Sequence, residues 1–354
     1  MNCIFSNNIQ LLSLDNSVYN LASNPLNITY SCTPESIDGT GNITADPGFV
    51  NDGTFYLAAN SPCIDAGNGD VAPVTDLDGK LRHDDFGARN TGTGTPDYAD
   101  MGVFEFQGSS SLNGQYTIGS TGDFTSFSEA VDSLISLGIS NSVLFTVEAG
   151  TYTEQLVIPE ISGATDSTTI TFQSASGDST DVILTYAATL ENENYTLKLD
   201  GADYITFKNM TLQATGTSYA RVVEITNGTK HNEFLNNRFE GVENSNELVC
   251  NINDPVLNDT SIVFSNNYFI KGKKAIHWHG SYDMSISDNM FYHQQDTAVF
   301  MVYGRVSSIK NNLFYSNHRA TAILLYEHFT DFAIEKNRIY LKNGGRGIDI
   351  YGRG

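Results

Sequence analysis

Short apolar strands alternate with Asn-rich bends along the last third of the chain. The bends share one pattern, in which two polar residues, mostly Asn, stand between apolar ones: FLNNRF, FSNNYF, ISDNMF, IKNNLF and IEKNRI at 234–239, 264–269, 286–291, 309–314 and 334–339. FKNMTL at 207–212 is a looser first copy. The second Asn, taken as Asn209 in that copy, recurs every 22–30 residues. Such a period with β-rich units indicates a solenoid, whose coils bury their apolar faces on one another.

A second short strand precedes each bend, and its residues alternate in character. Because side chains two apart lie on one face of a strand, two columns should form the interior. The first column is Leu197, Val223, Cys250, Ile276, Val299, Ile323 and Ile348. The second is Leu199, Ile225, Ile252, Trp278, Met301, Leu325 and Ile350. The residues between them, Asn251 and Asn253 among them, should point outward.

The Asn residues of the bends are predicted to be structural. Asn tolerates the left-handed backbone conformation and bonds neighbouring backbone groups. Stacked Asn side chains can also bond one another along the axis of a stacked β-structure. We therefore expect ladders of Asn rather than catalytic residues.

A different pattern begins after residue 113. GSSSLN at 108–113 is a linker of small residues. Ser126 and Glu129 then form a capping box, and an apolar stripe of helical spacing follows until Gly138, which is suited to end a helix. We expect a helix near 126–137 to cover the open end of a solenoid of residues 114–354, since a terminal coil otherwise exposes its core.

Two segments carry a family resemblance. DFTSFSEAVDSL…VLFTVEAGTYTEQLVI resembles the start of the right-handed parallel β-helix proteins of the pectin lyase-like superfamily, and the similarity covers 114–354. ADPGFV, SPCIDAG, TDLDG and DMG, in that order within 43–106, resemble the closing module of other bacterial β-helix proteins, often next to a surface anchor. The resemblance implies an all-β chain. Residues 1–107 would be the end of a first β-helix with its closing module, and 114–354 a second, truncated β-helix of a longer extracellular or bacterial cell-surface polypeptide.

The charge of the chain is unevenly spread. Residues 1–218 hold 27 Asp plus Glu against 5 Lys plus Arg, whereas 219–354 hold 14 of each and six of the seven His. The acidic first part argues against a nucleic-acid or anionic-membrane partner, and no apolar run approaches the length of a membrane span. The four Cys are too few for a disulfide scaffold, although Cys3 and Cys32, one coil apart, could stack or bridge.

The fold implied by the resemblance does not decide activity, because the superfamily includes lyases, hydrolases and esterases as well as adhesins. The sequence lacks the pectin methylesterase motifs expected after the GTYTE turn, and WHG at 278–280 is its only similarity to polygalacturonase motifs. Asp349 with Arg346 and Arg353 is the one candidate for a lyase site, and it lacks the clustered Asp residues that such a site needs. These observations favour a non-catalytic glycan-binding adhesin or a structural stalk; a polysaccharide lyase or glycoside hydrolase acting in a groove on the same face is the alternative.

One outward surface combines the groups that bind sugars. Aromatic rings stack on the apolar face of a sugar, and polar groups bond its hydroxyls. The coils between 275 and 351 supply candidates of both kinds, and we find no other stretch that does so on adjoining coils: His277, His279, Phe300, Tyr303, Arg305, Tyr326, Asp349 and Tyr351. A polysaccharide or cell-surface glycan is the expected partner, and cover by a loop or neighbouring chain is the competing interpretation.

Two patterns suggest a metal. His277 and His279 face one side of a strand, as metal ligands or a general base would, but a third ligand is missing from the neighbouring outward positions. TDLDGKLR places Asp76, Asp78 and Gly79 as in a calcium loop without the full twelve-residue motif. Calcium is thus the one cofactor suggested; surface imidazoles, and a loop closed by pairing of Asp78 with Arg82, are the favoured interpretations.

Overall fold

The structure, a computed structural model, describes residues 2–4, 28–34, 36–50, 54–85, 88–108, 111–243, 245–251 and 259–352, with the backbone alone at 281–282, 303–307 and 328–329. The chain divides into two compact units, unit 1 (Met1–Ser111) and unit 2 (Leu112–Gly354). The division falls within the segment 108–113 that the sequence marks as a linker. Helices long and apolar enough to cross a membrane do not occur in the described ranges.

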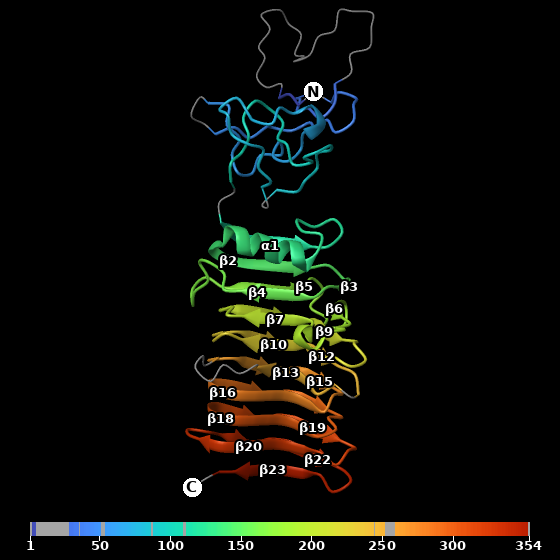
Figure 1. Cartoon of the computed structure of the whole chain (residues 1–354), viewed down its shortest axis with the longest axis vertical. Helices are drawn as coiled ribbons and strands as arrows, with labels where there is room; N and C mark the ends of the chain where they lie inside the picture. Colours follow the sequence, from blue (N-terminus) through green and yellow to red (C-terminus); the bar gives the residue numbers. More distant parts are fainter. Residues whose placement is uncertain are drawn as a thin grey trace, which may run out of the picture. The chain divides into compact units, whose positions relative to one another are not determined.

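Unit 2 is a right-handed parallel β-helix, as predicted, and its coils stack in parallel on three faces (Figure 1). Face A consists of β4 (Leu156–Pro159), β7 (Leu197–Asp200), β10 (Val223–Thr226), β13 (Glu247–Asn251), the first halves of β16 (Lys274–Ser287) and β18 (Thr297–Lys310), β20 (Thr321–Phe329) and β23 (Arg346–Tyr351). Face B consists of β1 (Leu112–Ile118), β2 (Ile139–Val147), β5 (Ile170–Ser174), β8 (Ile205–Lys208), β11 (Glu233–Leu235), β14 (Val263–Ser265), the second halves of β16 and β18, and β21 (Ile334–Glu335).

Face C is a separate eight-stranded sheet. Its strands are β3 (Gly150–Thr153), β6 (Val182–Tyr186), β9 (Thr211–Ala214), β12 (Arg238–Glu240), β15 (Tyr268–Ile270), β17 (Met290–Tyr292), β19 (Leu313–Ser316) and β22 (Arg338–Leu341). From β8 onward, the Asn-rich bends connect face B to face C.

The predicted interior columns of face A are confirmed for most coils. Trp278, Met301 and Leu325 lie side by side in the parallel register and are buried, as are Ile276, Val299 and Ile323 in the other column. Ile348 and Ile350 continue the columns on β23 and are exposed, because no described coil follows β23.

The register predicted for β13 is wrong by one residue. Val249, not Cys250, pairs with Val223 and Ile276, so Cys250 lies in the outward column beside His277. The cause is a run of two apolar residues, Leu248 and Val249, that are both buried where the chain enters the strand. Ile252 and Asn253 lie outside the described residues.

Asn251 therefore occupies an interior position, contrary to the expectation that it points outward. Its side chain donates to the Asp259 carboxylate at 3.1 Å and to the carbonyl of His279 at 2.6 Å, and it accepts from the His279 N–H at 2.7 Å. A buried amide with these partners avoids the cost of an unsatisfied polar group. The polar residue can thus replace an apolar one inside the coil.

Phenylalanine rings fill the interior behind faces B and C in two stacks. Neighbouring rings lie nearly parallel, with centroids 4.6–6.0 Å apart. The stack behind face B is Phe145, Phe172, Phe207, Phe234 and Phe264, and the stack behind face C is Phe239, Phe269, Phe291 and Phe314. The parallel register places equivalent rings of successive coils directly above one another.

A buried Asn ladder connects the bends, as predicted. The backbone N–H of each ladder Asn except the last donates to Oδ1 of the next at 2.8–2.9 Å, and each Nδ2 donates to the carbonyl of a residue on face B. The members are Asn237, Asn267, Asn289, Asn312 and Asn337. The ladder satisfies backbone groups that the tight bends would otherwise leave unpaired.

The first copy of the bend departs from the predicted alignment. Asn209 has φ +56° and matches the left-handed first position, which Asn236 and Asn266 occupy in later copies. Met210 takes the ladder position, and its N–H donates to Oδ1 of Asn237 at 3.1 Å. The ladder of Asn side chains therefore begins at Asn237.

Helix α1 (Phe127–Leu137) lies at the N-terminal end of unit 2, as the capping prediction requires (Figure 1). The residues that it buries belong to the same core cluster as the first coils. They are Phe127, Ala130, Val131, Ser133 and Leu134. Gly138, with φ +65°, ends the helix.

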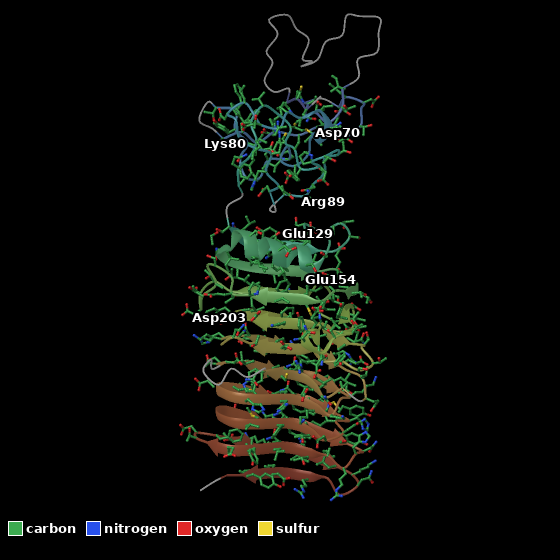
Figure 2. All side chains as sticks on the ribbon, viewed as in Figure 1. Asp70, Lys80, Arg89, Glu129, Glu154 and Asp203 are labelled. Carbon is green, nitrogen blue, oxygen red and sulfur yellow. The ribbon has the colours of Figure 1, made fainter. Side chains whose placement is uncertain are left out.

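The N-terminus of α1 is capped from two sides. Ser126 Oγ accepts from the Glu129 N–H at 3.1 Å, whereas the Glu129 carboxylate accepts from Thr125 instead of Ser126. Glu154, from the GTYTE turn, accepts from the N–H groups of Phe127 and Ser128 at 3.2 and 2.8 Å. Figure 2 shows Glu129 and Glu154 at this end of the β-helix. A carboxylate there also complements the helix dipole.

Unit 1 contains little regular structure in its described part. It has one 3-10 helix, Gly69–Val71, and isolated bridges such as the parallel ones of Cys32 with Ile4 and Ile43. The Cys32 N–H donates to the carbonyl of Cys3, but all four thiols of the chain are free. Its core is a small cluster of Cys32, Leu57, Cys63, Ile64, Ala66 and Met101.

Candidate functional site

The outward columns of face A bring most of the predicted surface together. The parallel register places His277 beside Phe300 and, through Leu324, in line with Asp349. The second column runs from His279 through Val302 and Tyr326 to Tyr351. The side chains of Tyr303 and Arg305 lie outside the described residues.

The two imidazoles form a connected group. His277 Nδ1 lies 3.2 Å from Glu247 Oε1, and its Nε2 lies 3.0 Å from Nε2 of His279. Two facing nitrogens at this distance need one proton between them, so the rings should not both be charged. Burial, followed by the charges of His277 and Lys274, lowers the pKa of His279. His279 is therefore neutral near pH 7.

A chain of ion pairs continues from this group toward the N-terminal coils. Arg221 lies 2.6 Å from Glu224 and 3.9 Å from Glu247, and Lys274 lies 3.8 Å from Glu247. Burial raises the pKa of Glu247, but the hydrogen bond and charge of His277 with the charges of Lys274 and Arg221 outweigh it, so the net shift is downward. The Glu247 carboxylate is therefore ionised and held by cations.

Cys250 lies within this ionic surface without being reactive. Burial raises the pKa of its thiol to about 12. Because the thiolate is the nucleophilic form, a thiol with so high a pKa is inert. The residue fills space between the coils.

An exposed aromatic group lies at the other end of face A. Tyr326 and Tyr351 are 44% and 49% exposed, and their ring centroids are 6.3 Å apart. Arg346 bonds both the Asp349 carboxylate and the Tyr351 hydroxyl, at 3.0 and 3.1 Å. Between the two groups Phe300 stacks on His277, with ring centroids 4.8 Å apart. Face A thus presents rings and charged groups on four successive coils.

The carboxylates of this surface are engaged in ion pairs. A general acid needs a carboxyl group with a raised pKa, whereas Glu247 is held ionised and Glu224 is paired with Arg221 and Lys198. Groups of three or more His, Cys, Asp or Glu side chains that could hold a metal do not occur within the described residues, the histidine pair included.

The structure reveals a second aromatic surface, on face C. It contradicts the expectation that only face A combines aromatic and polar side chains on adjoining coils. Tyr292 stacks on Tyr315 with centroids 5.4 Å apart, and Tyr340 follows in the same register and is 58% exposed. His293 lies 6.0 Å from His318, ring to ring. The sequence does contain the signal, because each bend is followed by Phe-Tyr or Ile-Tyr at 291–292, 314–315 and 339–340.

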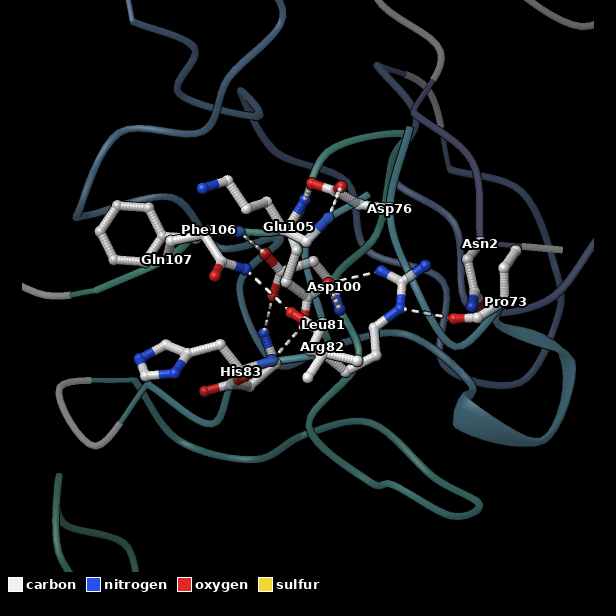
Figure 3. Close-up of polar contacts among 12 residues, drawn as sticks. Asn2, Pro73, Asp76, Leu81, Arg82, His83, Asp100, Glu105, Phe106 and Gln107 are labelled. Carbon is white, nitrogen blue, oxygen red and sulfur yellow. Dashed lines mark hydrogen bonds and ion pairs between the residues drawn. The ribbon is translucent and has the colours of Figure 1, made fainter. Parts of the chain in front are cut away.

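The calcium candidates in unit 1 have structural partners. Asp76 Oδ1 accepts from the N–H groups of Asp78 and Lys80 at 2.9 and 2.7 Å, and its Oδ2 accepts from that of Glu105 at 3.0 Å. These bonds outweigh burial and lower the pKa of Asp76. The predicted pair of Asp78 with Arg82 is wrong, because Arg82 binds Glu105 at 2.5 Å (Figure 3). Asp78 instead accepts from the Tyr56 hydroxyl.

Comparison with known proteins bears on the fold. The family profile described as "Right handed beta helix region" matches residues 250–354. The matched segment lies in unit 2, whose strands form a right-handed parallel β-helix. No curated protein sequence matches the chain.

Among similar solved structures is a pectin methylesterase from Aspergillus niger, with 14% identity, a TM-score of 0.47, and coverage of 70% of this chain and 87% of the other. A pectin methylesterase from Yersinia enterocolitica has 9% identity, a TM-score of 0.39 and coverage of 64% and 94%. The surface adhesin PfbA of Streptococcus pneumoniae has 11% identity, a TM-score of 0.28 and coverage of 62% and 89%. Similarities this weak carry no conclusion about the function of this chain.

Proposed function

We propose that unit 2 is the glycan-binding part of a secreted or cell-surface protein and that it binds without catalysis through face A. The observation that carries the proposal is the row of rings and charged groups on successive coils, from His277 and Phe300 to Tyr326 and Tyr351. Neighbouring coils are about 4.8 Å apart, close to the advance per ring of an extended pyranose chain. A polysaccharide lying along the axis of the β-helix can therefore contact one coil of face A with each sugar ring.

The chemistry of the two ends supports this use. Tyr326 and Tyr351 offer exposed rings on which a sugar can stack. Nearby, Arg346 offers a hydrogen-bond donor and Asp349 an acceptor for sugar hydroxyls. The imidazole group at His277 provides further polar partners. Aromatic rings combined with a few polar groups are typical of sites that bind small polar ligands.

A polysaccharide lyase or glycoside hydrolase is the second candidate, and one observation favours it. The lowered pKa of His279 makes this imidazole neutral, the form that a general base requires. Against it, Glu224 and Glu247 are engaged in ion pairs, so the acid partner that glycoside hydrolysis uses is missing from this group. Binding is the function that we favour.

A glycan array tests the proposal. We expect the wild-type protein to bind at least one polysaccharide and the double variant Tyr326→Ala/Tyr351→Ala to bind it about tenfold more weakly, since ring stacking contributes about 0.5–1.5 kcal/mol per pair. Tyr340→Ala, on face C, is the matched control. Equal binding by the double variant and the control would remove face A as the site.

Turnover decides between the two candidates. The wild-type protein is incubated with pectate, alginate and neutral glycans, and new reducing ends and the ultraviolet absorbance of unsaturated uronates are followed. We expect neither signal. Turnover that is lost in His279→Ala would replace the binding proposal by the enzymatic one.

A further inference from the structure

A polar groove lies on face B, away from the residues of the proposed site. Its volume is about 750 Å³, and its walls come from the first coils of unit 2, strands β1, β2, β5, β8 and β11. Pockets of roughly 300–1,000 Å³ hold small organic ligands. We propose that this groove binds an uncharged oligosaccharide.

The parallel register builds the groove from three outward columns. The first is Ser142, Thr169, Tyr204 and His231, which lie in line on successive coils because the residues that follow them pair in register. The second contains Thr171, Thr206 and Glu233, and the third contains Gln173, Lys208 and Leu235. Small side chains on the early coils and larger ones on the later coils produce a step.

Tyr204 forms the wall of this step. One face of its ring is stacked on His231, with centroids 4.9 Å apart and planes 10° apart. The preceding coils carry only Thr169 and Ser142 in the same column, and both line the groove. A ring backed on one side and bordered by small polar residues on the other is a platform on which a sugar ring can stack.

The remaining walls carry the hydrogen-bonding groups that sugar hydroxyls need. The side chains of Asp166, Lys208 and Glu233 line the groove and form no ion pair within the described residues, and those of Thr171, Thr206 and Gln173 form no hydrogen bond there. Carboxylates accept from hydroxyls, Lys donates to them, and Thr and Gln do both. The groove therefore offers unengaged donors and acceptors around the platform.

The charge of the walls selects the ligand. The groove is lined by two carboxylates, Asp166 and Glu233, and by Lys208 and the exposed His231. Most of the lining also lies in residues 112–218, the part of unit 2 that holds 13 acidic residues against 2 basic ones. An acidic glycan would be repelled, whereas an uncharged one meets acceptors and donors in balance.

The site on face B is independent of the one proposed on face A, and its test uses different residues. Calorimetric titration of the whole chain is carried out with cellohexaose, mannohexaose, xylohexaose and, as the acidic comparator, hexagalacturonate. Tyr204→Asn removes the ring at a position with φ +60°, which Asn tolerates. Thr206→Trp fills the groove and leaves the Tyr204 ring in place. Tyr340→Asn, on face C, is the matched control.

We expect at least one uncharged hexasaccharide to bind, with about tenfold weaker binding in both groove variants and no change in Tyr340→Asn or in Tyr326→Ala/Tyr351→Ala. Absence of binding by all three uncharged probes, or tighter binding of hexagalacturonate, overturns the inference. Binding that survives in both groove variants and is lost in the face A double variant also overturns it, while leaving the proposal for face A intact. Circular dichroism of each variant checks folding, and Thr206→Trp decides the outcome if Tyr204→Asn does not fold.

Discussion

The two units of the chain are stabilised by different chemistry. Unit 2 repeats one coil, so apolar columns, stacked Phe rings and the Asn ladder contribute many similar contacts between neighbours. Unit 1 has a small apolar cluster and, beside it, a group of buried carboxylates around Arg82. Repetition distributes the stability of a solenoid over its coils, whereas unit 1 depends on a few specific contacts.

The buried acids of unit 1 make the contrast sharper. Asp65, Asp100 and Glu105 are all buried, and Asp65 Oδ1 has no hydrogen-bond partner in the described structure. Burial, followed by neighbouring carboxylates, raises the pKa of Asp65 to about 9 and that of Asp100 to about 7. Unit 1 should therefore lose stability as pH rises and on loss of the Arg82 charge.

Of the single substitutions, the largest effect is expected from a Phe in the middle of unit 2. Phe264→Ala removes a fully buried ring that stacks on Phe234 and meets Phe239 and Phe269 edge-on. The cavity should lower the free energy of unfolding of unit 2 by about 3–5 kcal/mol. Hydrogen exchange, followed by mass spectrometry on peptides from the two units, should show faster exchange in the coils around 264 and unchanged exchange in 36–107. Equally faster hydrogen exchange in both units would contradict the division of the chain into two separately stabilised units.

Breaking the Arg82–Glu105 pair tests the opposite unit. Arg82→Met leaves the fully buried carboxylate of Glu105 without its cation, which costs about 3 kcal/mol, near the lower end for such pairs because Arg82 is partly exposed. Peptides from unit 1 should exchange faster, and those from 114–354 should not. Lys310→Met removes a partner of an exposed pair with Glu335 and is the control; it should change stability by less than about 0.5 kcal/mol.

A single rung of the Asn ladder should have a smaller effect. Asn289→Ala leaves the N–H of Asn267 and the carbonyl of Phe264 without their partners, a loss of about 2 kcal/mol. Asn311→Gly changes the neighbouring position, which has the left-handed φ of +58°. Gly adopts this conformation without strain, so the substitution should hardly change the free energy of unfolding. Urea denaturation of the two variants measures the difference. Similar losses of unfolding free energy in both variants would mean that the left-handed bend conformation, and not the hydrogen bonds of the ladder, determines stability.

The pH dependence should be the most gradual effect. Asp65 and Asp100 keep protons in the folded state at pH values where an unfolded Asp, with a pKa near 3.9, has lost them. The folded state then binds more protons, so this contribution is fully present below about pH 4 and is lost as pH rises toward 9. The slope is about 1.4 kcal/mol per pH unit for each retained proton.

Asp65→Asn checks the assignment of this slope. The amide keeps the shape of the side chain and cannot titrate, so the decline in stability of unit 1 between pH 7 and 9 should flatten. Hydrogen exchange of unit 1 peptides at pH 5, 7 and 9, corrected for intrinsic rates, measures the slope. An unchanged decline in the variant would assign it to other groups.

Much of unit 2 could be predicted because its determinants are local. The period of the bends, the alternation in the strands and the capping box around Ser126 each lie within a few consecutive residues, and the structure confirms the fold and the helix that they predict. The face A columns from 275 to 351 follow from the same alternation. Those columns also gave the relative positions of His277, Phe300 and Tyr326.

The remaining features depend on contacts between coils. Cys250 and Asn209 were each misplaced by one residue, because adjacent apolar or polar residues fit two registers equally well until neighbouring coils choose between them. Glu247 was missed as the partner of His277 for the same reason.

The sequence by itself thus determined the repeat, the interior and the cap, because those patterns are short-range. Only the tertiary structure decided which side chains of different coils meet: Tyr204 with His231 on face B, Tyr292 with Tyr315 on face C, and Arg82 with Glu105 in unit 1. These partners are more than twenty residues apart in the chain. Stacking of coils, or in unit 1 the folding of irregular loops, is what brings them within a few ångströms.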